Sequence, residues 1–249
     1  MARTGNEVRN LFITKYSSIN SGVAPDINPY EMSIYLTEAK KQIIDTYSHN
    51  TVATGIDQNE RVKKHLSKIA LSESFTSFSP FDTFSFKQNS AQFIQLPDYI
   101  WRVMYETAQF DAEDCQGSLM GEIQPMGWDE MIRVLANPFR GPSDKRIIRV
   151  DVNGGHLLVS KYPLESYNIV YLKFPTPYII MDLEEFADEY GFTDNQGNPL
   201  TIDGQTGLSL NELDLYMDDL IIDRAIELAK KDYEEGSLQA HIALNNRNL

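Results

Sequence analysis

Histidine and cysteine are the side chains of this 249-residue chain with the most versatile chemistry, as metal ligands, general bases or nucleophiles. The four histidines are His49, His65, His156 and His241. They are scattered, and no His-x-x-x-His or Cys-x-x-Cys spacing brings two ligands to one metal ion. The single cysteine, Cys115, follows Glu113 and Asp114, whose carboxylates disfavour the thiolate that a nucleophile requires. We therefore expect no metal site, no cofactor and no reactive cysteine.

Paired carboxylates are the other candidates for chemistry. Glu184 with Glu185, and Asp218 with Asp219, each offer the two carboxyl groups that acid–base catalysis uses. Neighbouring helical residues point about 100° apart, so neither pair shares a face. Residues 194–198 resemble a calcium loop but lack the glycine at the sixth position and the glutamate at the twelfth. We expect an ordinary turn and a non-enzymatic protein, with a metal-dependent hydrolase as a less favoured alternative.

The net charge excludes more classes of function than any other feature of the composition. The formal net charge is −14, from 22 Lys and Arg against 36 Asp and Glu, which argues against a protein that holds nucleic acid tightly. Neither lysine nor arginine occurs between Lys173 and Arg224, whereas basic residues cluster at 40–41, 61–68 and 145–149. Opposite charges on different faces suit head-to-tail contacts, which close into rings when the rotation permits. Alternatively, an acidic face lines a channel and repels DNA phosphates. The two interpretations stay open.

The apolar content is sufficient for a packed core but not for a membrane span. Hydrophobic residues make up 42% of the chain, which argues against wholesale disorder. The length allows one large domain or a core with a sizeable insertion. No run of about 18 apolar residues is found, so we expect no membrane partner.

Helical periodicity marks the N-terminal part of the chain. Apolar spacing predicts a helix over about 7–19. Asn28 as cap, Pro29 at N1 and Glu31 at N3 predict a second helix, which runs to about residue 47. A third is expected to begin at Asp57. These helices must bury their apolar faces against other elements.

The strongest helical pattern predicts a helix from Leu208 to Gly236. Ser209 and Glu212 form a capping box at its start, and Gly236 is a C-terminal stop. A shorter helix should precede it, capped by Asp182 and stopped by Gly191. The residues that we expect to pack a bundle of the terminal helices are Met32, Leu36, Leu213, Met217, Ile221 and Leu228. The candidates for a channel-facing acidic patch are Asp214, Asp218 and Asp219.

The apolar period changes from helical to two at about Phe75, which indicates strands. We expect strands over about 100–107, 148–152, 156–160 and 167–174. Asn153-Gly154 predicts a tight hairpin turn, and one helix, over about 127–135, interrupts the strands. The predicted class is α+β. Residues 1–74 and 182–249 form a helical bundle, and residues 75–181 form an inserted β-rich subdomain.

Three segments resemble virion proteins of crAss-like bacteriophages. Asn28–Ala39 (NPYEMSIYLTEA) is similar to their N-P-Y-E-x-S-x-x-L-T-x-A opening. Tyr178–Ile180, which follows two prolines, is similar to a P-x-P-I-I-L stretch. Glu212-Leu213 and then Ile222–Ala229 resemble the E-L and I-x-x-R-A-V-x-x-A pattern of the closing helix. The resemblance covers about a third of the chain and lies in its helical ends.

This resemblance implies a structural component between portal and tail that has no catalytic residues. We expect a head–tail connector or tail ring protein, in a ring of twelve copies around the DNA channel below the portal. The expected partners are the portal, neighbouring tail ring proteins and double-stranded DNA that passes without specific binding. We expect the protein in the virion tail or neck, after assembly in the host bacterial cytoplasm.

Two further alternatives to a connector ring stay open, and one mutation tests the channel. The first is a tail hub, or another virion protein that acts through its β subdomain. The second is a monomeric regulatory binding module. If the acidic patch faces the channel, reversing Asp218 and Asp219 to lysine should slow DNA passage and leave ring assembly intact.

Overall fold

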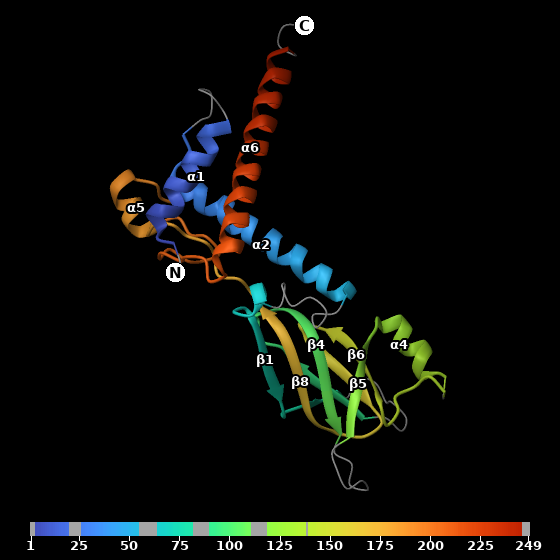
Figure 1. Cartoon of the computed structure of the whole chain (residues 1–249). Helices are drawn as coiled ribbons and strands as arrows, with labels where there is room; N and C mark the ends of the chain where they lie inside the picture. Colours follow the sequence, from blue (N-terminus) through green and yellow to red (C-terminus); the bar gives the residue numbers. More distant parts are fainter. Residues whose placement is uncertain are drawn as a thin grey trace. The chain divides into compact units, whose positions relative to one another are not determined.

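The computed structural model describes residues 3–19, 26–54, 64–81, 90–110, 119–137 and 139–245. The chain forms two compact units. The helical unit contains Met1–Lys68 and Pro175–Leu249, and the sheet unit contains Ile69–Phe174. Helices and an eight-stranded sheet share the chain, so the α+β class is confirmed (Figure 1).

The first two helices start with reciprocal caps. Helix α1 (Gly5–Ile19) begins after Thr4, whose amide donates to Glu7 Oε2 at 2.8 Å, while the Glu7 amide donates to Thr4 Oγ1 at 3.3 Å. Helix α2 (Pro29–Thr54) confirms the predicted start. The Glu31 amide donates to Asn28 Oδ1 at 2.8 Å, and the Asn28 amide donates to Glu31 Oε2 at 3.0 Å. The predicted helix from Asp57 lies largely outside the described residues, of which 64–66 are helical.

Helix α5 (Leu183–Tyr190) confirms the predicted cap and stop. The Asp182 side chain accepts the amides of the first turn, and Gly191 ends the helix at φ 70°, a conformation that favours glycine. Helix α6 (Leu215–Asn245) differs from the prediction at both ends. It starts later than Leu208 and continues past Gly236.

The predicted capping box at Ser209 is wrong because the backbone of that residue is used elsewhere. Ser209 forms an antiparallel bridge with Ile179, with N–O distances of 2.7 and 3.0 Å in the two directions. The cap of α6 is Asp214, whose Oδ1 accepts the Met217 amide at 2.9 Å. The long helix therefore starts only after a loop that is already bound to another extended segment.

The core of the helical unit lies where α6 packs against α2 and α1. Met32, Leu36, Leu213, Met217 and Ile221 are all buried there, at 5% exposure or less. Leu228, on a later turn of α6, is only half-buried. These apolar contacts hold α6 in the orientation from which its polar residues reach the rest of the unit.

The sheet unit is one eight-stranded sheet in the order β1-β8-β4-β5-β6-β7-β3-β2 (Figure 1). Its strands are β1 (Ala70–Phe75), β2 (Ser79–Pro80), β3 (Ser90–Gln95), β4 (Ile100–Phe110), β5 (Leu119–Pro125), β6 (Arg146–Val152), β7 (Gly155–Ser160) and β8 (Leu164–Lys173). Neighbouring strands are antiparallel except β5 and β6, which are parallel and are connected through helix α4 (Trp128–Leu135). Strand β1 begins within the segment 1–74 that we expected to be helical.

The sheet curls so that strands distant in its order share one core. Ile94 of β3 belongs to the same buried cluster as Tyr167 and Ile169 of β8. The opposite face of β6 and β7 is covered by α4, through Met131. The hairpin between β6 and β7 is confirmed: Asn153 and the glycine after it have φ of 47° and 75°, as a tight hairpin turn requires.

Candidate functional site

An extended segment, residues 176–180, is bound along helix α2. The α2 residues that bind it are Ser33, Thr37 and Lys40, whose spacing places them on one face of the helix. The serine hydroxyl accepts the Ile180 amide at 3.2 Å, and the threonine hydroxyl accepts the Tyr178 amide at 2.9 Å. The lysine Nζ donates to the Thr176 carbonyl at 2.8 Å. Two of the segments that carry the family resemblance are therefore hydrogen-bonded to each other.

The start of α1 closes over the same segment at Gly5. A Cβ added there would lie 2.1 Å from the Ile180 carbonyl oxygen. Replacing Gly5 with alanine should therefore lower the free energy of unfolding by about 1–3 kcal/mol, the usual cost of overpacking. Helix propensity alone predicts the opposite sign, because alanine is the better helix former by up to about 1 kcal/mol.

Urea denaturation of the Gly5→Ala protein measures this effect. The matched control is Gly207→Ala in the same unit, where an added Cβ meets nothing within 4 Å. We expect that control to stay within about 0.5 kcal/mol of the unsubstituted protein. A Gly5→Ala protein that is more stable than the unsubstituted chain contradicts the close approach.

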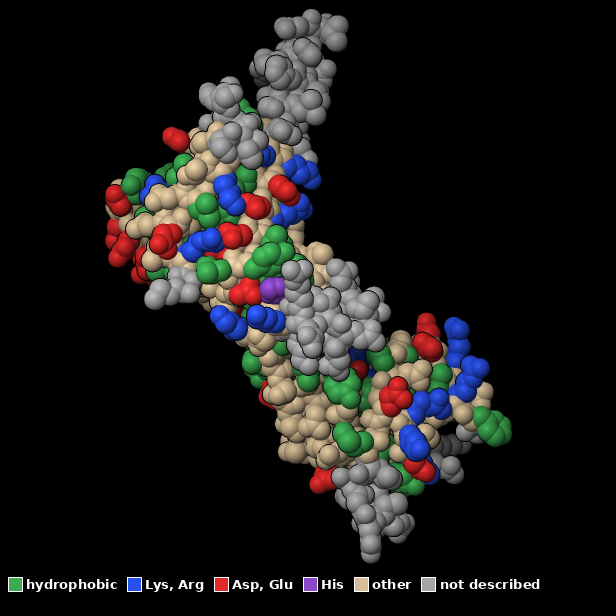
Figure 2. Space-filling view, in the orientation of Figure 1, with side chains coloured by type: hydrophobic (Ala, Val, Ile, Leu, Met, Phe, Trp, Pro, Cys, Tyr) green, Lys and Arg blue, Asp and Glu red, His purple; other side chains and the backbone are tan. Residues whose placement is uncertain are grey.

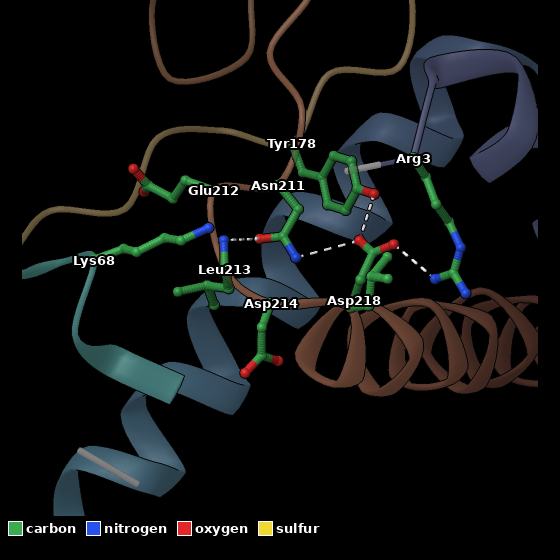
Figure 3. A pocket seen from close by; sticks show the side chains of 9 residues that line it. Arg3, Lys68, Tyr178, Asn211, Glu212, Leu213, Asp214 and Asp218 are labelled. Carbon is green, nitrogen blue, oxygen red and sulfur yellow. Dashed lines mark hydrogen bonds and ion pairs between the residues drawn. The ribbon is translucent and has the colours of Figure 1, made fainter. Parts of the chain in front are cut away.

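Asp218, near the start of α6, is the centre of a buried polar cluster (Figure 3). Its Oδ1 accepts from Tyr178 Oη at 2.6 Å and from Asn211 Nδ2 at 3.2 Å. Its Oδ2 pairs with Arg3 Nη1 at 2.7 Å. Only 3% of Asp218 is exposed, so this carboxylate is an internal group. One side chain thus ties four separate parts of the helical unit together.

The electrostatics of the cluster keep each proton in place. Burial, and then the hydrogen bond to Asp218, raises the pKa of Tyr178 well above its usual value. The hydrogen bond to Asp218 likewise raises the pKa of Arg3. Asp218 therefore lies as an acceptor between the Tyr178 hydroxyl and the Arg3 guanidinium. This arrangement joins α6 to the N-terminal segment and to the extended segment at Tyr178.

A pocket of about 600 Å³ lies beside this cluster. Arg3, Lys68, Glu212 and Asp214 are among its lining residues (Figure 3). The lining carries both signs of charge, from Arg3 and Lys68 and from Glu212, Asp214 and Asp218.

Asp214 combines two structural tasks. It caps α6, and its Oδ2 contacts Nδ1 of the buried His65. Burial would raise the pKa of Asp214, but the hydrogen bonds from the Met217 amide and from His65 outweigh it and lower that pKa. The His65 ring stacks on Tyr216 with a centroid distance of 5.2 Å. The segment before the sheet unit is thereby attached to the start of α6.

The structure separates the three candidates for the acidic patch. Asp218 is inside the unit, so we expect the reversal of Asp218 to disturb the fold, and Asp219 alone is the better position for a test of the channel. Asp219 has a side chain that is 47% exposed and pairs with Arg3 Nη2 at 2.7 Å. Asp214 keeps 35% side-chain exposure. This difference could not be read from local sequence, because Arg3 and Tyr178 are far from Asp218 in the chain.

Several acids of the interval without lysine or arginine have cationic partners from the N-terminal helices. The pairs are Lys15 with Asp223 at 2.6 Å, Lys41 with Asp203 at 2.8 Å and Lys40 with Glu212 at 3.6 Å. Basic and acidic segments are therefore partly matched within one helical unit. Acidic side chains that gather on the surface are those of α5: Glu184, Glu185, Asp188 and Glu189 (Figure 2).

The sheet unit contains a second buried polar network. His156 Nδ1 lies 2.7 Å from Tyr167 Oη, which donates to Glu106 Oε2 at 2.6 Å. The tyrosine has one proton to give, so His156 is the donor to its oxygen. Arg149 Nη1 donates to Glu106 Oε1 at 2.8 Å. Tyr167 is fully buried and His156 is 5% exposed, so this network joins strands β4, β6, β7 and β8 inside the sheet unit.

The turn at residues 194–198 satisfies its own polar groups. Asp194 Oδ1 accepts the amides of Gln196 and Asn198, each at 2.8 Å, as in an ordinary Asx turn. Within the described residues, no three His, Cys, Asp or Glu side chains converge as metal ligands. None of the described helices has the length and apolarity of a membrane span. Cys115 and the side chain of His241 lie outside what the structure describes.

Comparison with known proteins gives one consistent result over nearly the whole chain. The family described as phage tail ring protein 3/4 matches residues 3–240. Ring protein 3 of Bacteroides phage crAss001 is 31% identical over 235 residues, which cover 91% of this chain and 94% of that protein. Ring protein 4/5 of the same phage is 30% identical over 252 residues, which cover 97% of this chain and 98% of that protein.

Proposed function

The chain belongs to the phage tail ring protein 3/4 family, and from that premise we propose that it is a non-enzymatic head–tail connector or tail ring component. In this proposal twelve copies form a ring around the DNA channel below the portal. The observation that carries the proposal is the family match over residues 3–240, which includes both the helical and the sheet unit. The portal and neighbouring ring proteins are its partners, and the virion tail or neck is its location after assembly in the host cytoplasm.

The helical unit supplies the contacts between subunits in this proposal. Its bundle, formed within Met1–Lys68 and Pro175–Leu249, is packed in this proposal by Met32, Leu36, Leu213, Met217, Ile221 and Leu228, and neighbouring copies extend it. Exposed apolar side chains on α6 support such contacts: Leu215 is 46% and Tyr216 is 49% exposed. The inserted sheet unit, Ile69–Phe174, reaches the neighbouring ring. A ring built this way needs no cofactor, because its work is mechanical.

Chemical crosslinking of purified virions, followed by mass spectrometry, tests the proposal. We expect crosslinks between copies of this chain, and crosslinks from it to the portal and to other tail ring proteins. Crosslinks through the sheet unit alone to hub or fibre proteins would favour the tail-hub function instead. A chain that crosslinks to no tail or portal protein contradicts the proposal.

The channel-facing acidic patch is carried in this proposal by Asp219 together with Asp214, because Asp218 is internal. DNA then passes without specific binding, since like charges repel the phosphates. Reversing Asp219 to lysine should leave the fold intact and slow DNA packaging or ejection by about twofold or more, because the new cation attracts phosphate. Packaging and ejection rates of phage that carries Asp219→Lys measure this. Unchanged rates in assembled particles contradict a channel-facing position.

A further inference from the structure

The loop between α4 and β6 presents Phe139, of which 93% is exposed, the highest value among the large hydrophobic side chains that the structure describes. Hydrogen bonds hold this loop in shape. The Asn137 side chain accepts the Phe139 amide at 3.0 Å, and the Asn137 carbonyl accepts the amides of Arg140 and Gly141 at 3.0 and 3.2 Å. Arg146 Nη2 donates to the Gly141 carbonyl at 2.8 Å. The phenyl ring is therefore displayed by a defined loop.

Basic residues lie near Phe139 in the chain. Between Ile132, itself 56% exposed, and the start of β6 the chain carries four basic residues, Arg133, Arg140, Lys145 and Arg146. The one acid in this interval, Asp144, is paired with Lys161 at 2.7 Å. Figure 2 shows Lys and Arg side chains over the α4 region, with a hydrophobic side chain protruding beside them. We refer to residues 132–146 as the basic knob.

The helical unit contains an aromatic pocket of about 350 Å³ between α1, the start of α2 and α5. Its apolar lining includes Phe12, Ile13, Tyr16, Phe186, Tyr190 and Phe192. The Phe186 ring stacks on Phe192 at a centroid distance of 5.4 Å, and lies 5.0 Å from the Tyr190 ring. Tyr190 and Phe192 remain 57% and 45% exposed. A cavity of about 150 Å³ already binds benzene, so this pocket can accept a phenyl ring.

Acidic side chains are exposed on one of the helices that form the pocket. Helix α5, which contributes two of the lining rings, exposes Glu184, Glu185, Asp188 and Glu189 (Figure 2). The lining itself also includes Arg9 and Asp26, one residue of each sign. Helix α5 and the charged lining residues together therefore carry a net negative charge, opposite to that of the basic knob. Aromatic side chains in pockets, surrounded by complementary charge, are the usual centres of protein interfaces.

We propose that Phe139 of one copy inserts into the aromatic pocket of a second copy, where the basic knob meets the acids of α5. Knob and pocket are different surfaces of the same chain, so the contact is heterologous and propagates from copy to copy until a ring closes. This inference rests on the proposed ring function and names the contact that would build it.

Photocrosslinking tests the contact directly. The full chain carries p-benzoylphenylalanine at position 139, is mixed with a ¹⁵N-labelled unsubstituted copy, and is irradiated over a concentration series. We expect labelled peptides from residues 9–32 or 183–192 to be captured. The control places the probe at Tyr105, a 62% exposed aromatic residue of β4 in the same unit. The proposal is overturned if the probe at position 139 captures peptides from other parts of the chain. It is also overturned if the crosslinking yield from position 139 does not exceed that from position 105 at any concentration.

Charge reversal tests the same contact by affinity. Phe139→Asp should weaken self-association, measured by sedimentation, at least about tenfold, whereas Tyr105→Asp should stay within about twofold. Arg140→Glu and Glu189→Arg should each weaken self-association. The double variant, which carries both substitutions in one chain, should associate within about threefold of the unsubstituted protein. A Phe139→Asp protein that associates like the Tyr105→Asp control overturns the proposal. If virions contain the tail ring but this crosslink does not form, only the proposed contact is refuted. If the crosslink forms but virions contain no such ring, the proposed function is refuted.

Discussion

Replacing Asp218 with lysine is expected to lower the free energy of unfolding of the helical unit by about 3–5 kcal/mol, the usual cost of breaking a buried ion pair. The new ammonium would face the Arg3 guanidinium, which now lies 2.7 Å from the carboxylate. Tyr178 and Asn211 would lose the acceptor to which both donate. Because whole domains are stable by only about 5–15 kcal/mol, this loss removes a large fraction of the stability of the unit.

Urea denaturation followed by circular dichroism measures this loss, with Asp219→Lys as the matched control. Asp219 is the next residue on the same helix and also pairs with Arg3, but its side chain is 47% exposed. An exposed ion pair contributes about 0–1 kcal/mol, so the control should remain folded. Equal effects of the two reversals would contradict the internal role of Asp218.

Lowering the pH from 6.5 to 4 should reduce the free energy of unfolding of the sheet unit by up to about 3 kcal/mol through His156 alone. Burial, and then the charge of Arg149, lowers the pKa of His156 to about 4. The unfolded imidazole takes up its proton below pH 6.5, whereas the folded one takes it up only near pH 4. The unfolded state therefore binds more protons in this window, and stability present above pH 6.5 is lost as the pH falls.

The His156→Asn protein isolates this contribution. The asparagine amide can donate to Tyr167 Oη from a position close to that of Nδ1, and it does not titrate. Carboxylates titrate in both proteins, so the difference between the two stability curves reports the histidine. We expect the curve of the variant to be flatter between pH 6.5 and 4. Parallel curves would show that His156 is not held neutral.

The elements that sequence predicts well are those fixed by local chemistry. The Asn28 and Glu31 cap and the Asn153-Gly154 turn depend on residues at most three positions apart, and the structure contains both. The failure at Ser209 has the opposite cause. Its local pattern is a good helix start, but a bridge to Ile179 takes its backbone. Strand β1 was missed because its edge position leaves it half-exposed and without a clear apolar period.

The polar cluster could not be predicted, since each of its bonds joins distant parts of the chain. Arg3 and Asp218 are 215 positions apart, and Tyr178 and Asp218 are 40 apart. In the sequence Asp218 looks like one more acid in an interval without lysine or arginine. Only the packing of α6 against α1 and α2 turns it inward and leaves its neighbour Asp219 at the surface. Charge counting alone therefore overstates the acidic surface of α6.

Cryo-electron microscopy of purified virions, at a resolution that traces side chains, tests the ring function most directly. We expect this chain in a closed ring of twelve copies around the DNA channel, between the portal and the tail tube. In that ring Phe139 of each copy should lie against α5 of its neighbour. The account is contradicted if this chain occupies a tail hub, a fibre or the capsid interior, or is absent from the particle.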